Sequence, residues 1–150
     1  MKDARVTLVT LASDDLERSA GFYAALGWVR TPAGNDTVIF MQGEGIVLSI
    51  FGRDDFVKDV GVSFEGGCPF PSIALALNLA SEADVDRLFD AAVAAGGAPV
   101  KRPEPTFWGG YSGYVSDLDG HLWELAHNPF FPLDERGHLD LLTPASGSDA

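Results

Sequence analysis

The strongest candidate for chemistry in this sequence is a carboxylate, Glu124, in the middle of the apolar run HLWELA. The segment before it, FWGGYSGYVSD, supplies aromatic rings, among them Trp108 and Tyr114. A carboxylate removed from water needs a hydrogen-bond donor or a positive charge beside it. Glu124 is therefore predicted to bond to Tyr114 or the backbone, to contact a ligand, or to do both. Aromatic faces attract planar rings and cations, so the same residues suit a planar or cationic organic molecule.

The turn before Glu124 determines which side chains share its face. A three-residue loop, LDG, with its glycine in the left-handed conformation, pairs Asp117 with His121 and puts Tyr114 directly across from Glu124. Side chains alternate along a strand, so Ser112 joins Tyr114 and Glu124 on one mixed face, which is expected to line a cavity. The opposite, apolar face is expected to pack under a helix and contains Val115, Trp123 and Leu125.

Two earlier runs extend this pattern to the rest of the expected cavity. In SIALALNL, the small or polar residues Ala74, Ala76 and Asn78 alternate with large ones and are expected on the cavity side. The run GEGIVLSIF also follows an acid–glycine turn, and the same loop rule pairs Gln42 with Ile46. The side chains that this pairing turns toward the cavity are Ile39, Met41, Val47, Ser49 and Phe51.

These elements recur because the chain contains an internal repeat. Leu16 and Val85 are 69 residues apart, as are the helix-ending Gly27 and Gly96, and the acid–glycine turns are 75 residues apart. Helices are predicted near residues 14–26 and 82–95, each between strands. The expected fold is α+β, with two tandem β-α-β-β-β modules forming a curved mixed sheet around a cavity. Module 1 spans 5–52, a linker 53–71, module 2 72–127 and a C-terminal arm 128–150.

Composition restricts the classes of partner. The chain has 10 basic and 22 acidic side chains and a net charge of −12, which argues against nucleic acid, where phosphates require Lys and Arg. No run approaches the roughly 20 apolar residues of a membrane-spanning helix, and the first residues lack the pattern of a secretion signal. One cysteine permits no internal disulfide, so a cytoplasmic location is expected.

The segments DLERSAGFYAALGW and SDLDGHLWELA resemble two signatures of the vicinal oxygen chelate superfamily, which includes glyoxalases, bleomycin-resistance proteins and extradiol dioxygenases. The resemblance covers roughly residues 5–127. Enzymes of this superfamily hold a divalent metal with His, Glu or Gln on inward strand positions. Similarity puts those positions at Leu8, Ser49, Ala74 and Glu124.

The residues at these four positions do not suit a metal. A transition-metal site needs about three protein ligands, mostly His or carboxylate, and only Glu124 qualifies. The three histidines do not supply the rest, because His121 and His127 fall on the helix side and His138 lies in the arm. The resemblance with these ligands missing therefore implies no metal and no other cofactor.

A metal-free protein that sequesters an aromatic, antibiotic-like molecule is the leading functional hypothesis, with a homodimer expected from the resemblance. The alternative is an enzyme of the same superfamily, either a metal-dependent lyase, isomerase or dioxygenase, or a metal-free one with Glu124 as base and Tyr114 as acid. A structural or regulatory domain without a ligand is a third possibility. The expected ligand-binding residues are Thr10, Ile39, Ser49, Phe51, Ala74, Asn78, Trp108, Ser112, Tyr114 and Glu124.

Overall fold

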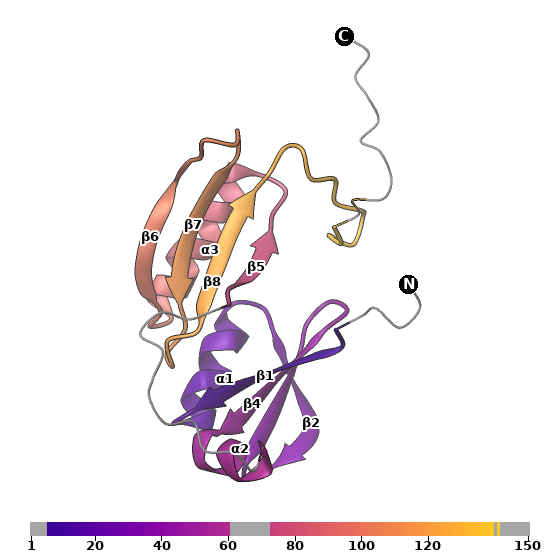
Figure 1. Ribbon diagram of the computed structural model, residues 1–150, viewed down its shortest axis with the longest axis vertical. Helices are drawn as coiled ribbons and strands as arrows, with labels where there is room; N and C mark the ends of the chain where they lie inside the picture. Colours follow the sequence, from indigo (N-terminus) through magenta and orange to yellow (C-terminus); the bar gives the residue numbers. More distant parts are fainter. Residues whose placement is uncertain (1–5, 61–72, 140, 142–150) are drawn as a thin grey trace.

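The computed structural model describes residues 6–60, 73–139 and 141, and these form two modules of the same topology (Figure 1). Each module has one strand, a helix and three further strands, which confirms the predicted α+β fold and tandem repeat. The eight strands are divided equally between two sheets, one for each module. The first strand of each sheet runs parallel to its neighbour, and the remaining pairs are antiparallel.

Module 1 has the sheet order β1-β4-β3-β2, with helix α1 packed on one face. Asp15 caps α1 by accepting a hydrogen bond from the backbone N–H of Arg18 at 3.1 Å. The elements are β1 (Leu8–Ser13), α1 (Leu16–Ala25), β2 (Val29–Asn35), β3 (Val38–Gln42) and β4 (Val47–Gly52).

Module 2 repeats this arrangement with the order β5-β8-β7-β6 and helix α3. Ser81 caps α3, as Asp15 caps α1, and Gly27 and Gly96 follow the two helices with φ of 99° and 103°. The matched left-handed glycines explain the repeated spacing in the sequence. The elements are β5 (Leu75–Asn78), α3 (Glu82–Ala94), β6 (Ala98–Pro105), β7 (Tyr111–Ser116) and β8 (Leu122–His127).

Three elements were not assigned from the sequence. Strands β2 and β6 lie at the sheet edges and contain prolines, which an edge strand tolerates because one side of its backbone needs no partner. The expected linker, 53–71, begins with a helix, α2 (Arg53–Val60), and its remaining residues lie outside the described part of the chain. Phe56 of α2 contacts Phe51 of β4, with ring centroids 5.6 Å apart.

The predicted strand register is confirmed in module 2 and wrong in module 1. Tyr114 pairs with Glu124, but Gln42 pairs with Val47 rather than Ile46. The loop between β3 and β4 has two residues, Glu44 and Gly45, since the Gly43 N–H donates to the Ile46 carbonyl at 2.9 Å. A one-residue slip turns every side chain of a strand to the other face.

This slip moves two residues of β3 from the expected cavity into the core. Ile39 is 3% exposed and Met41 is fully buried among Leu48, Ile50 and the side chains of α1. The expectation that Ile39 faces a ligand was therefore wrong. Phe40, which lies between them on the strand, pairs with Ser49 and points to the opposite face.

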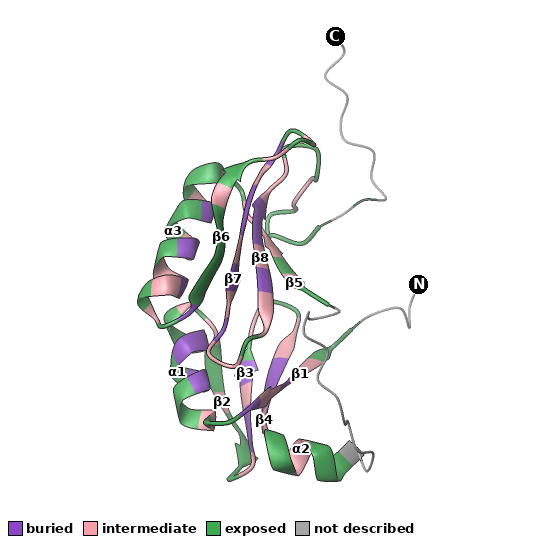
Figure 2. Ribbon diagram, turned by 60° about the vertical axis from the view of Figure 1, so that its left-hand side comes forward, coloured by how far each residue is buried: buried purple, intermediate pink, exposed green. Residues whose placement is uncertain are grey.

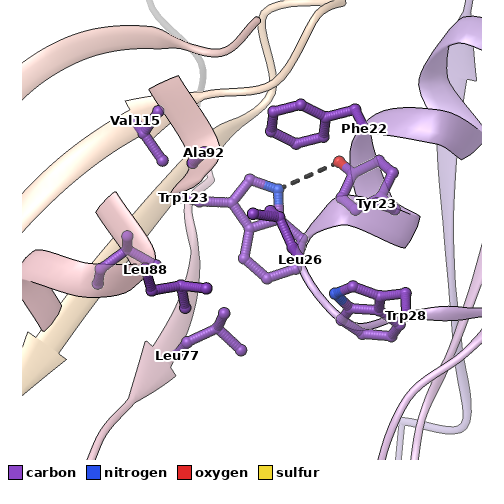
Figure 3. Close-up of a pocket in the computed structure, with 10 residues that line it drawn as sticks. Phe22, Tyr23, Leu26, Trp28, Leu77, Leu88, Ala92, Val115 and Trp123 are labelled. Carbon is purple, nitrogen blue, oxygen red and sulfur yellow. Dashed lines mark hydrogen bonds between the residues drawn. The ribbon is translucent and has the colours of Figure 1, made fainter. Parts of the chain in front are cut away.

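One hydrophobic core, between the sheets and helices α1 and α3, contains residues of both modules. In Figure 2, α1 and α3 lie one above the other, and both carry buried, purple positions. At the junction, the rings of Tyr23, Trp28 and Trp123 meet with centroids 6.1 to 6.3 Å apart (Figure 3). The apolar gap between them measures about 10 Å³, which leaves no room for an organic ligand.

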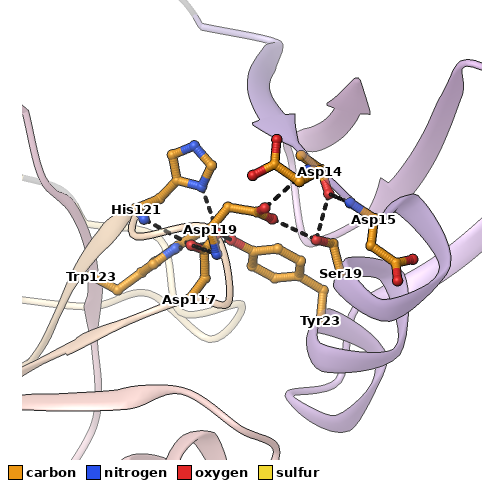
Figure 4. A network of polar contacts seen from close by, with 9 residues as sticks. Asp14, Asp15, Ser19, Tyr23, Asp117, Asp119, His121 and Trp123 are labelled. Carbon is orange, nitrogen blue, oxygen red and sulfur yellow. Dashed lines mark hydrogen bonds and ion pairs between the residues drawn. The ribbon is translucent and has the colours of Figure 1, made fainter. Parts of the chain in front are cut away.

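A network of hydrogen bonds among Tyr23, Ser19, Asp117, Asp119 and His121, called the joint below, also connects module 2 to module 1 (Figure 4). The buried carboxylate of Asp117, 4% exposed, accepts hydrogen bonds from Tyr23 at 2.6 Å and from the His121 ring and backbone at 2.7 Å each. The carboxylate of Asp119 in the same turn accepts from Ser19 at 2.6 Å and from the backbone of Asp14 at 3.0 Å. The β7–β8 turn is therefore anchored to the beginning of α1.

Burial alone would raise the pKa of the Asp117 carboxyl. The hydrogen bonds from His121 and Tyr23 outweigh this effect and hold the pKa below its ordinary value. Because the folded-state pKa is depressed, the joint contributes its full stability at neutral pH and loses it as the pH falls through that pKa.

Among the described residues, no helix combines the length and the hydrophobicity that crossing a bilayer requires.

We predict that Tyr23→Phe lowers the free energy of unfolding by about 1–3 kcal/mol, because it leaves the buried Asp117 carboxylate without its hydroxyl donor. Tyr111→Phe is the matched control, since it removes a Tyr–Asp hydrogen bond of 2.7 Å at an exposed position. We expect the control to change stability by less than about 0.5 kcal/mol. Urea unfolding at neutral pH measures both, and equal losses in the two variants would contradict the role of the joint.

Candidate functional site

The site is built around a hydrogen bond between two neighbouring strands of module 2. The hydroxyl of Tyr114 on β7 donates to Oε2 of Glu124 on β8 at 2.5 Å. This bond raises the pKa of Tyr114, because ionising the phenol would remove the donor and put a second negative charge beside the carboxylate. The bond holds one oxygen of Glu124 in place and accounts for a half-buried acid in a strand interior.

A cavity of about 420 Å³ opens beside this pair, within the size range of small-molecule sites. Its floor comes from β5 and β8, one side from the β6–β7 turn, and another side from the segment that follows β8. It thus combines an aromatic pair, a carboxylate and two amides. The lining residues are Asn78, Trp108, Glu124, Ala126, Asn128 and Phe131.

The indole of Trp108 has a defined position because the turn that carries it is hydrogen-bonded internally. The Thr106 N–H donates to the Gly110 carbonyl at 2.9 Å, and the Gly110 N–H donates to the Thr106 hydroxyl at 3.0 Å. Gly109 has φ of 87°, a conformation that favours glycine. A methyl group at Gly110 would overlap the indole, so this glycine lets the ring fold back over its own turn.

The other predicted residues of module 2 do not line this cavity directly. Ser112 is buried beside it and pairs with Ala126 on the same face. Tyr114 supports Glu124 from the neighbouring strand. Ala74 lies just before β5 and is exposed, while Ala76 pairs directly with Glu124.

The predicted residues of module 1 are on a separate sheet and do not line this cavity. Thr10 and Ser49 pair across β1 and β4 on one face, the same face that carries Phe51. Within one chain, the structure therefore brings together Asn78, Trp108 and Glu124 but leaves Thr10, Ser49 and Phe51 apart from them.

Three lining residues were not predicted to bind a ligand. Ala126 lies two residues after Glu124 on β8 and therefore on the same face. Asn128 and Phe131 belong to the C-terminal arm. A usable signal was the sequence NPFF, because Asn before Pro favours a turn that folds the chain back. In the structure, Asn128 accepts a hydrogen bond from the Phe130 N–H at 2.9 Å through its side-chain oxygen.

The residues on the concave faces do not fit a divalent metal. The four expected positions, Leu8, Ser49, Ala74 and Glu124, offer one carboxylate and one hydroxyl. In the structure the residues paired with Ser49 and Glu124 are Thr10 and Ala76 rather than Leu8 and Ala74, and they add only one more hydroxyl. Such a set lacks the three His or carboxylate ligands that these metals require.

Elsewhere in the described part of the chain, one group of side chains could hold a metal ion. Asp117, Asp119 and His121 have ligand atoms within 4.8 Å of one another, but they form the joint with α1. Their hydrogen bonds to Tyr23, Ser19 and each other account for this proximity. The group therefore has a structural explanation.

Comparisons with known proteins agree on one family. The model for the Glyoxalase/Bleomycin resistance protein/Dioxygenase superfamily matches residues 5–125. A crystal structure of a glyoxalase-related enzyme from Fulvimarina pelagi is 37% identical, with a TM-score of 0.82, covering 95% of this chain and 99% of that one. No curated protein matches.

Two more distant structures share the fold alone. Lactoylglutathione lyase from Agrobacterium tumefaciens is 18% identical with a TM-score of 0.64, covering 83% of this chain and 94% of its own. TioX from Micromonospora sp. ML1 is 21% identical with a TM-score of 0.57, covering 83% and 98%. Together with the duplicated β-α-β-β-β modules, the match over residues 5–125 shows that this chain belongs to the glyoxalase/bleomycin resistance protein/dioxygenase superfamily.

Proposed function

We propose that this protein binds a small, largely planar organic molecule in the module 2 cavity and sequesters it unchanged, without a metal. The observation that carries the proposal is the combination of Trp108, Phe131 and one carboxylate, Glu124, around a space of about 420 Å³. Small-molecule sites typically have apolar walls and a few placed polar groups, and this cavity has that balance.

The charge of the site favours a cationic ligand. Tyr114 engages Oε2 of Glu124, which leaves Oε1 to accept a hydrogen bond or to face a positive charge. A cation over an aromatic face gains about 0.5–2 kcal/mol, and the chain's net charge of −12 adds long-range attraction. Since the superfamily includes bleomycin-resistance proteins, we propose an antibiotic-like molecule as the ligand and the cytoplasm as the place of action.

A homodimer is part of the proposal. Within one chain, the concave residues of module 1, such as Thr10 and Ser49, do not meet the cavity of module 2. A second copy that presents its module 1 to this cavity would add the missing wall. Closed two-fold dimers are the commonest symmetric assemblies, and the two modules offer complementary halves for one.

The alternative is turnover. The similar protein from Fulvimarina pelagi is described as a glyoxalase-related enzyme. The bonded pair of Tyr114 and Glu124 also has the geometry of a proton donor beside a base. Sequestration and turnover differ in stoichiometry, since a binding protein returns at most one unchanged ligand for each site.

We expect Trp108→Ala to weaken binding of a planar cation, 1-methylquinolinium, by at least about fivefold, because one ring contact contributes about 1 kcal/mol beyond its buried area. Trp108→Phe is the control that keeps an aromatic face. Glu124→Gln keeps the shape of the site and removes its charge, so it should weaken 1-methylquinolinium more than the neutral 1-methylnaphthalene. Equilibrium dialysis measures each dissociation constant.

Recovery of the bound molecule tests the binding-only function. After incubation with excess protein, mass spectrometry should return the ligand unchanged and in at most equimolar amount. Conversion of many equivalents by catalytic amounts of protein would establish turnover instead. Equal affinity of wild type and Trp108→Ala for both probes would contradict the proposed site.

We predict that the purified protein holds no stoichiometric Zn, Ni, Mn or Fe on its concave faces, because the pairs Thr10–Ser49 and Ala76–Glu124 supply one carboxylate. Elemental analysis after dialysis measures the metal content. About one metal per chain that disappears in Glu124→Gln would overturn this prediction.

We predict a dimer in solution at micromolar concentration. Sedimentation equilibrium should give about twice the chain mass of 15.9 kDa. A single species at the monomer mass across this concentration range would contradict the proposed shared cavity.

A further inference from the structure

Residues 128–139 of the C-terminal arm, called the arm below, form one wall of the module 2 cavity. Asn128 and Phe131 line the cavity together with residues of the sheet. The matched family region ends at residue 125, so this wall lies beyond it. In Figure 1 the arm leaves the end of β8 and turns back beside the sheet toward module 1.

The first part of the arm is packed against the turn that carries Trp108. The Phe131 N–H donates to the Asn128 carbonyl at 3.0 Å, and the Phe130 N–H donates to the Asn128 side chain at 2.9 Å. These bonds fold the arm back at its start. The ring of Phe130 lies over Gly109, where an added Cβ would come within 3.0 Å of it. The arm and the β6–β7 turn therefore hold each other in position at the edge of the cavity.

The second part of the arm is a compact turn organised by Asp134. One oxygen of its carboxylate accepts from the N–H groups of Arg136 and His138 at 2.8 Å each. The Asp134 N–H donates to the His138 carbonyl at 2.9 Å, and Leu133 bridges to Leu139. This turn presents the side chains of Arg136 and His138 on one side.

Those two side chains meet a single residue of module 1. Glu44, in the β3–β4 turn, forms an ion pair with Arg136, and its Oε1 lies 3.5 Å from Nε2 of His138. The Arg136 and Glu44 side chains are 70% and 52% exposed. An exposed ion pair of this kind is weak and easily broken, so it can hold the arm in place without locking it.

We propose that residues 128–139 are a strap along one wall of the module 2 cavity, in which Phe131 contacts the ligand and the Glu44–Arg136 pair is a latch that slows ligand release. The proposal rests on the proposed function of that cavity. Phe131 is then a specificity-determining residue of the site. Glu44 and Arg136 are positioning residues, since they act on the ligand only through the arm.

The test measures the dissociation rate of 1-methylquinolinium by stopped-flow tryptophan fluorescence. Glu44→Gln should raise this rate about two- to fivefold, the range expected when one exposed ion pair is lost. Glu17→Gln is the matched control, because it removes the same charge and breaks another exposed pair, Glu17–Arg30, away from the arm. The control should keep the wild-type rate.

Two further variants separate the latch from a general charge effect. The swap of Glu44→Arg with Arg136→Glu should bring the dissociation rate back toward wild type. Phe131→Ala should raise the dissociation constants of both 1-methylquinolinium and the neutral 1-methylnaphthalene, because it removes a wall rather than a charge. Amide hydrogen exchange of residues 130–139 other than Pro132, without any probe, should be faster in Glu44→Gln than in Glu17→Gln.

The outcomes distinguish this proposal from the function on which it rests. Failure of the wild type to bind either probe would contradict the binding function and the strap together. Binding by the wild type with unchanged release in Glu44→Gln and unchanged affinity in Phe131→Ala would overturn the strap and leave the binding function standing. Equal exchange of the arm in Glu44→Gln and Glu17→Gln would overturn the latch.

Discussion

The arrangement of the two modules depends on one buried carboxylate. Asp117 is 4% exposed and lies at the β7–β8 turn, where it accepts hydrogen bonds from Tyr23 of module 1 and from His121 of its own module. An unpaired charge at this depth would be costly, so the two modules must stay in register for the acid to remain satisfied. Tyr23 also accepts a hydrogen bond from Trp123 at 3.3 Å, which links the joint to the aromatic core.

The repeat gives each module an acidic residue at its hairpin turn, and each acid reaches outside its own module. Asp119 bonds to Ser19 at the beginning of α1 in module 1. Its counterpart 75 residues earlier, Glu44, pairs with Arg136 in the arm that follows module 2. The first contact is partly buried and the second is exposed. Burial strengthens electrostatic contacts and solvent weakens them. The contact of Asp119 should therefore be the stronger of the two, and that of Glu44 the weaker.

Sequence reasoning succeeded where the turn chemistry was unambiguous. The LDG loop correctly placed Tyr114 across from Glu124, and the glycines correctly ended both helices. It failed in module 1 because an acid–glycine pair also fits a two-residue loop, and that choice moved Ile39 into the core. The arm could not be placed, since Arg136 finds Glu44 only after the whole fold has brought two distant segments together.

With one carboxylate among the residues at the expected metal positions, the proposed site would select its ligand by other means than a metal site does. A bound metal selects ligands by their donor atoms, whereas Glu124 with Trp108 and Phe131 offers charge and ring faces. The bond from Tyr114 holds one oxygen of Glu124, so the carboxylate has a defined position even without a ligand. Preorganised charge reduces the cost of binding, while stacking tolerates many ring systems. For the proposed planar ligands, selectivity would then come from the walls, and the arm is the wall whose position depends on a contact outside the module.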